Sequence, residues 1–74
     1  MNSLEARFGL VLKELRVKKG YSQESLAIDC DLDRTYISLL ERGLRQPTIS
    51  TLFTIATALG VTPSSIIKEL EKEK

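Results

Sequence analysis

The sequence contains no histidine and only one cysteine, and these two scarcities exclude several kinds of chemistry. A lone thiol, Cys30, cannot form an internal disulfide or build a metal site of the usual Cys/His spacing. Without histidine the commonest general acid–base side chain is missing, and Cys30 has no evident base partner along the chain. Glycine-rich phosphate loops are absent too. We therefore expect no enzymatic activity, no metal and no cofactor, and interpret Cys30 as a small packing residue.

Long apolar runs are also missing. No run approaches the roughly 20 apolar residues of a membrane span, and the first residues, MNSLEARFGL, lack an apolar core of the signal-peptide type. The 74 residues suit a single domain, which we assign to residues 1–74. We expect this domain to lie in the cytoplasm, where a free thiol stays reduced, with no membrane partner and no room for a small-molecule ligand.

The chain has little net charge, but its charges are unevenly distributed. The formal net charge is +1, yet residues 1–20 carry five basic residues against two acidic ones. Residues 21–50 carry three basic residues against five acidic ones. A domain of near-zero net charge can still present one basic face, so composition by itself leaves nucleic-acid binding open.

Helical periodicity dominates what the sequence does contain. Five short runs carry apolar residues at helical spacing, and no segment alternates with period two long enough to form a strand. Glycines follow three of these runs, where helices often end, and polar caps precede the later ones. We expect an all-α domain of five helices, with caps at Ser22, Asp33, Thr48 and Thr62 and with Pro63 at a first helical position.

Residues 22–43 hold two of these runs, separated by a short acidic hinge at Asp31–Asp33. A plain helical hairpin would explain the spacing. However, the second run opens with Arg34, Thr35 and Tyr36, and arginine near a helix N-terminus opposes the helix dipole. An exposed set of this kind suits the DNA major groove. Ser22 and Gln23, at the start of the preceding run, suit a phosphate contact.

The segment YSQESLAIDCDLDRTYISLLERG resembles the helix-turn-helix of the lambda-repressor-like (Cro/cI, XRE) family of DNA-binding domains. The following RQPTISTLFTIATALGV is similar to the same family, and the resemblance covers about residues 4–67. Within the family, LDRTYIS followed by ER resembles the controller proteins of restriction–modification systems. The resemblance implies five helices, the third a recognition helix, in a transcription regulator that binds a palindromic operator on double-stranded DNA as a homodimer.

Residue by residue, the resemblance implies a DNA-binding set and a structural ion pair. The DNA-binding set comprises Ser22, Gln23, Arg34, Thr35, Tyr36, Ser38, Leu39, Arg42 and Arg45. The ion pair joins Arg16 to Glu41. Two positions depart from the family pattern: Asp31 stands where glycine is usual, and Leu39 where a polar or small residue is common. Aspartate tolerates a left-handed backbone, so the turn should survive, whereas Leu39 leaves the operator sequence open.

Apolar residues of the last run exceed what the core of so small a domain needs. The predicted dimer interface comprises Phe53, Val61, Pro63, Ile66 and Ile67, with Leu70 beside them. The same surface also suits an alternative function, in which the fold serves as an antitoxin-like or other protein-interaction module. Substitution of Arg34 by alanine distinguishes the two functions. It should weaken the binding of a DNA-binding regulator to its operator, and it should change the partner binding of an interaction module little.

Overall fold

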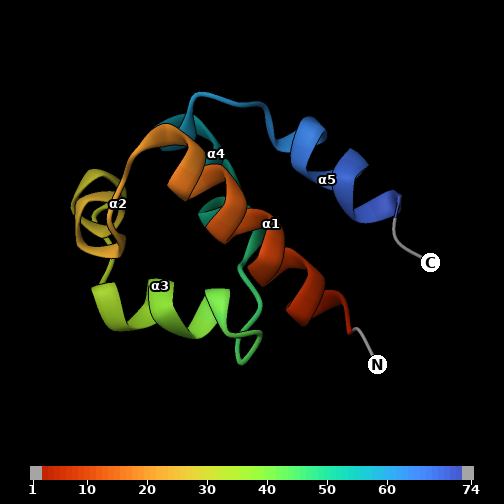
Figure 1. The fold of residues 1–74 in the computed structure, drawn as a ribbon, viewed down its shortest axis with the longest axis horizontal. Coiled ribbons are helices and arrows are strands. Elements are labelled where there is room, and N and C mark those ends of the chain that lie inside the picture. Colours follow the sequence, from red (N-terminus) through yellow and green to blue (C-terminus); the bar gives the residue numbers. More distant parts are fainter. Residues whose placement is uncertain (1–2, 73–74) are drawn as a thin grey trace.

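The computed structural model describes residues 3–72, which contain five α-helices and no strand. The helices are α1 (Leu4–Lys19), α2 (Gln23–Cys30), α3 (Arg34–Glu41), α4 (Ile49–Leu59) and α5 (Pro63–Glu71). In Figure 1, α1 crosses the middle of the molecule, with α3 on one side of it and α5 on the other. The all-α, five-helix expectation is confirmed.

Polar caps begin the helices where the sequence placed them. The side chains of Ser22, Thr48 and Thr62 each accept a hydrogen bond from the backbone N–H three residues further on, at 3.0–3.1 Å. Asp33 caps α3 through a longer contact of 3.4 Å to the amide of Thr35. A further cap, Ser3, precedes α1 and accepts from the amide of Ala6. Each cap satisfies a donor that the first helical turn cannot satisfy itself.

The apolar residues of all five helices meet in one core. Leu26, Ile37, Leu40, Ile55 and Ala56 are completely inaccessible to solvent. Cys30 is buried among them, as expected for a packing residue, and burial raises the pKa of its thiol. Among residues 3–72 no single helix is long and apolar enough to cross a membrane, and the two helices that reach this limit together, α4 and α5, are bent by 105°.

Two glycines allow α1 and the end of α3 to approach very closely. A Cβ atom on Gly9 would lie 2.5 Å from the carbonyl oxygens of both Leu40 and Glu41, which are backbone atoms and cannot move aside. A Cβ on Gly43 would lie 2.9 Å from the Cα of Ala6, and Gly43 has a φ of 75° besides. The last turn of α3 is therefore seated directly on the backbone of α1.

Candidate nucleic-acid interface

The turn between α2 and α3 is held by backbone hydrogen bonds. Asp31 adopts the left-handed conformation (φ 56°, ψ 43°), and its amide donates to the carbonyl of Ile28 at 3.1 Å. The amide of Leu32 donates to the carbonyl of Ala27 at 2.8 Å, and its side chain packs against the core. Aspartate thus fills the position where the family usually has glycine, at a modest cost in backbone strain. The corner turns α3 away from α2 and leaves its first turn at the surface.

Helix α3 has a buried side, an exposed N-terminal end and half-buried residues between them. Ile37 and Leu40 are fully buried, whereas Arg34 and Thr35 are exposed at its N-terminus. Ser38 and Leu39 lie further along the helix and are half-buried. Burial of the apolar side fixes the rotation of the helix about its axis, so the polar side chains are presented outward as one set.

Tyr36 has a mixed environment. Its ring packs against the core, and its hydroxyl donates to the carbonyl of Gln46 in the α3–α4 loop at 3.5 Å. The side chain therefore braces this loop, and only its exposed part remains for an outside partner.

The N-terminus of α2 lies beside the C-terminus of α3, and a buried ion pair joins both to α1. Arg16 donates from Nε to Glu41 Oε2 at 2.5 Å and from Nη2 to Glu41 Oε1 at 3.1 Å. Its Nη1 donates to the carbonyl of Tyr21, just before α2, at 2.8 Å. The side chains are 11% and 4% exposed, respectively. One guanidinium group thus holds three segments together.

Ser22 and Gln23, the two residues expected at a phosphate, occupy this junction. Ser22 is exposed and its hydroxyl is engaged with Ser25, accepting from the backbone amide and donating to Oγ. Gln23 is half-buried, and its Nε2 donates to Glu41 Oε1 at 3.0 Å. Arg42 and Arg45, beyond the end of α3, are both exposed. The nine residues predicted to bind DNA therefore lie on the helix-turn-helix and the loop that follows it.

Ile66 is buried in the core, so its assignment to the predicted dimer interface was wrong. It is only 2% exposed, and Leu70 beside it is 8% exposed, because the inner side of α5 closes the core. Val61 and Pro63 are half-buried, and Val61 packs against the core. Periodicity alone could not tell the inner from the outer side of this apolar helix.

Phe53 and Ile67 are exposed, at 56% and 41%, and two further apolar residues join them that the sequence analysis missed. Ile49 is 74% exposed and lies one turn before Phe53 on α4, and Leu4 is 52% exposed. Leu4, Ile49 and Ile67 line a cleft of about 220 Å³ with core side chains beneath it. We call Leu4, Ile49, Phe53 and Ile67 the apolar surface. The i, i+4 spacing of Ile49 and Phe53 in the sequence could have indicated that these two residues share one side of the helix.

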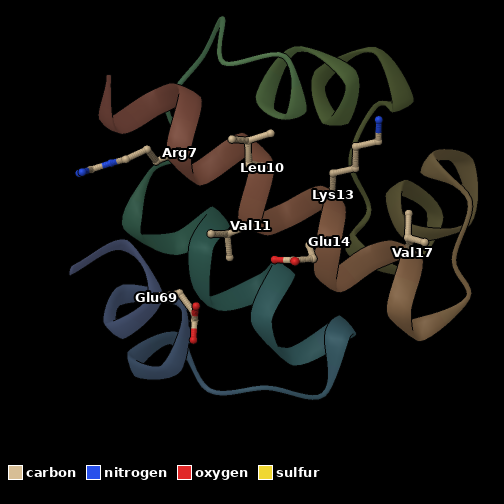
Figure 2. Close-up of a pocket in the computed structure, with 7 residues that line it drawn as sticks. All are labelled: Arg7, Leu10, Val11, Lys13, Glu14, Val17 and Glu69. Atoms are coloured by element: carbon tan, nitrogen blue, oxygen red, sulfur yellow. The ribbon is translucent and has the colours of Figure 1, made fainter. Parts of the chain in front are cut away.

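A second, open hollow of about 570 Å³ lies along the outer side of α1 (Figure 2). Its charged lining is balanced, with Arg7 and Lys13 of one sign and Glu14 and Glu69 of the other. It is therefore no basic surface for a phosphate backbone. Within residues 3–72 no cluster of three or more metal-ligating side chains occurs.

Comparison with known proteins places these features in a family. Residues 12–66 match the family model HTH_3, described as helix-turn-helix. The chain belongs to this helix-turn-helix family, which confirms the resemblance drawn from the sequence. Its relatives are transcription regulators rather than enzymes, in agreement with the expectation of no enzymatic activity.

Among its relatives the chain is similar to controller proteins. It is 46% identical over 74 residues to control protein C.MunI of Mycoplasma sp, covering 99% of this chain and 100% of that protein. It is 42% identical over 67 residues to control protein C.BamHI of Bacillus amyloliquefaciens, covering 89% and 83%. The restriction–modification controller protein C.Esp1396I, solved as a tetramer with its natural 35 base-pair operator, superposes with a TM-score of 0.85 at 39% identity, over 97% of this chain and 95% of that one.

Proposed function

We propose that this protein is a sequence-specific DNA-binding transcription regulator that controls genes of a restriction–modification system. The observation that carries the proposal is the exposed polar start of α3, held by a helix-turn-helix whose fold matches an operator-bound controller protein. The relatives at 46% and 42% identity are control proteins of the same kind. A regulator of this type works where its DNA lies, so we place it in the cytoplasm.

In this proposal α3 enters the major groove by its N-terminal turn. Arg34 is exposed there and can donate two parallel hydrogen bonds to O6 and N7 of a guanine. Thr35 lies beside it and can meet a thymine methyl or a phosphate, and Ser38 and Leu39 follow one turn further on. Because Ile37 and Leu40 lock the opposite side of the helix into the core, these side chains reach the groove already oriented.

Backbone contacts would come from both ends of the motif. The amides of Gln23 and Glu24, in the first turn of α2, have no acceptor within the helix, and with the Gln23 side chain they can meet an approaching phosphate. The amide of Ser25 already donates to Ser22 Oγ. Arg42 and Arg45 supply positive charge at the far end of α3. Such contacts set the orientation of the protein on the duplex, while the α3 side chains read the bases.

The apolar surface supports a homodimer. Leu4, Ile49, Phe53 and Ile67 are large apolar side chains that remain 41–74% exposed, and contiguous exposed apolar patches often mark interaction sites. A two-fold dimer through this surface would carry two copies of α3 on one duplex, with half-sites about 34 Å apart, one turn of DNA. A palindromic operator follows from that symmetry.

Selection of random duplexes by the purified protein at about 150 mM salt, followed by sequencing, tests the proposal. A two-fold-symmetric site should be enriched. Arg34→Ala should lose about 1–3 kcal/mol of binding free energy for that site and relax the preference at one base pair of each half-site. Lys68→Ala, an exposed basic residue on α5, is the matched control and should bind normally. Absence of any enriched sequence would reject the proposal and favour the protein-interaction alternative.

A further inference from the structure

The geometry points to Glu41 as a positioning residue that orients Gln23 for its contact with the DNA backbone. This inference rests on the proposed function and adds a role for a carboxylate that itself never reaches the duplex. Glu41 ends α3, its side chain is 4% exposed, and it lies against the first turn of α2. A buried acidic group so near a phosphate-binding helix end requires a reason, because its charge opposes the phosphate.

The hydrogen bonds around Glu41 provide that reason. Oε2 accepts from Arg16 Nε, and Oε1 accepts from both Arg16 Nη2 and Gln23 Nε2. The guanidinium group neutralises the carboxylate, so the local charge cost is largely removed. What remains is an oriented acceptor for Gln23.

A carboxylate distinguishes the nitrogen end of a glutamine amide from its oxygen end. An ionised carboxylate can only accept hydrogen bonds, so it binds the nitrogen end of Gln23 and rejects the oxygen end. The amide nitrogen has two hydrogens, and Glu41 occupies one of them. The second hydrogen stays available beside the uncapped amides of Gln23 and Glu24, where a phosphate oxygen would sit. Without Glu41 the amide could turn over and direct its oxygen at the phosphate.

Glu41→Gln is the informative substitution because its two effects on DNA binding have opposite signs. It also weakens the buried ion pair with Arg16, so binding is compared at a temperature where the variant remains folded. Removal of a negative charge should by itself strengthen binding to DNA. Loss of the oriented acceptor should weaken DNA binding. A glutamine at this position can donate as well as accept, so it no longer selects the nitrogen end of the Gln23 amide. We expect a net loss of about five- to tenfold in operator affinity, about the size of one ordinary hydrogen bond, because the gain from the removed charge offsets part of a larger, charge-assisted loss. Glu24→Gln, an exposed carboxylate on α2, isolates the charge effect and should bind equally or more tightly.

The test is a double-mutant cycle in operator affinity, measured by fluorescence anisotropy for wild type, Glu41→Gln, Gln23→Ala and the double variant. Circular dichroism should show that all four are folded at the temperature used. If Glu41 acts through Gln23, its substitution should weaken binding in the wild-type background and no longer do so once Gln23 is alanine. An equal loss in both backgrounds would overturn the inference, because a purely structural role does not depend on Gln23.

Nuclear magnetic resonance supplies a second readout that needs no DNA. The wild-type sequence has two glutamines, Gln23 and Gln46, and one asparagine, Asn2, so their side-chain amide signals are easily assigned, and Glu41→Gln adds one further set that is identified as new. Glu41→Gln should shift the Gln23 signals and leave those of Gln46, which donates to Glu5, unchanged. Unchanged Gln23 signals would refute the inference. Failure of the wild-type protein to select any duplex would instead refute the proposed function, and the spectra would still decide whether Glu41 holds Gln23.

Discussion

Replacement of Arg16 by methionine should be among the most damaging single changes in this domain. The guanidinium group makes two hydrogen bonds to Glu41 and one to the carbonyl of Tyr21. Methionine keeps much of the aliphatic volume but leaves a carboxylate that is 4% exposed without its counter-charge. Gln23 alone, a neutral donor, cannot replace it.

The expected loss of stability follows from the burial of the Arg16–Glu41 ion pair. Breaking a buried ion pair by removing one partner costs about 3–5 kcal/mol. The total free energy of unfolding of a domain of this length is roughly 4–11 kcal/mol. Arg16→Met should therefore remove a large share of the free energy of unfolding and lower the melting temperature by about 15–30 °C.

Urea unfolding followed by circular dichroism measures the effect, and two further variants sharpen it. Arg45→Met makes the same change at an exposed position and should alter stability by less than about 0.5 kcal/mol. The double variant Arg16→Met with Glu41→Met removes both charges, so no unpaired carboxylate remains, and it should recover at least about half of the loss. A cost below about 1 kcal/mol for the single variant, or a double variant no more stable than the single one, would refute the reasoning.

Three other predictions concern association, salt and pH. Ile67→Asp, on the apolar surface, should shift the protein from dimer to monomer in sedimentation equilibrium at about 10–100 µM, in the range of weak interfaces. The neighbouring control Lys68→Asp should leave the dimer intact, and a wild type that is monomeric throughout would refute the dimer proposal. The logarithm of operator affinity should fall with the logarithm of salt concentration with a slope of about −4 to −6 per dimer, and a slope near −10 would reveal a basic surface beyond Arg42 and Arg45. Burial raises the pKa of the Cys30 thiol above its unfolded value of about 8.5, so its contribution to stability is complete below that pH and is lost as pH rises through the folded pKa. The free energy of unfolding should thus decline as the pH rises above about 8.5, and that of Cys30→Ala, measured by the same urea titration, should decline less. Identical curves would contradict this assignment.

Much of the fold could be predicted because its signals are local. Caps, terminal glycines and helical periodicity each act within one or two turns, and the caps at Ser22, Thr48 and Thr62 lie where the residue types placed them. The left-handed turn at Asp31 is equally local, since aspartate is one of the few residues other than glycine that tolerate it. Elements set by such short-range physics need no knowledge of their neighbours.

The errors and omissions concern neighbours that are distant in the chain. Ile66 and Ile67 are adjacent and chemically identical, yet one closes the core and the other is exposed, because only the packing of α5 on α1 and α4 decides which side faces inward. The contact between Gln23 and Glu41 joins residues 18 positions apart and could not be read from either segment.

The sequence by itself therefore determined the helices, the turn and the chemical character of the candidate reading helix, since each depends on residue type and short-range spacing. The tertiary structure alone decided which apolar residues remain at the surface and how the end of α3 is tied to α2. The physical reason is that burial and long-range hydrogen bonds are properties of surfaces brought together by folding. Gly9 illustrates both levels: it is one small residue in the sequence, and in the fold it is the point at which α1 meets the backbone of α3.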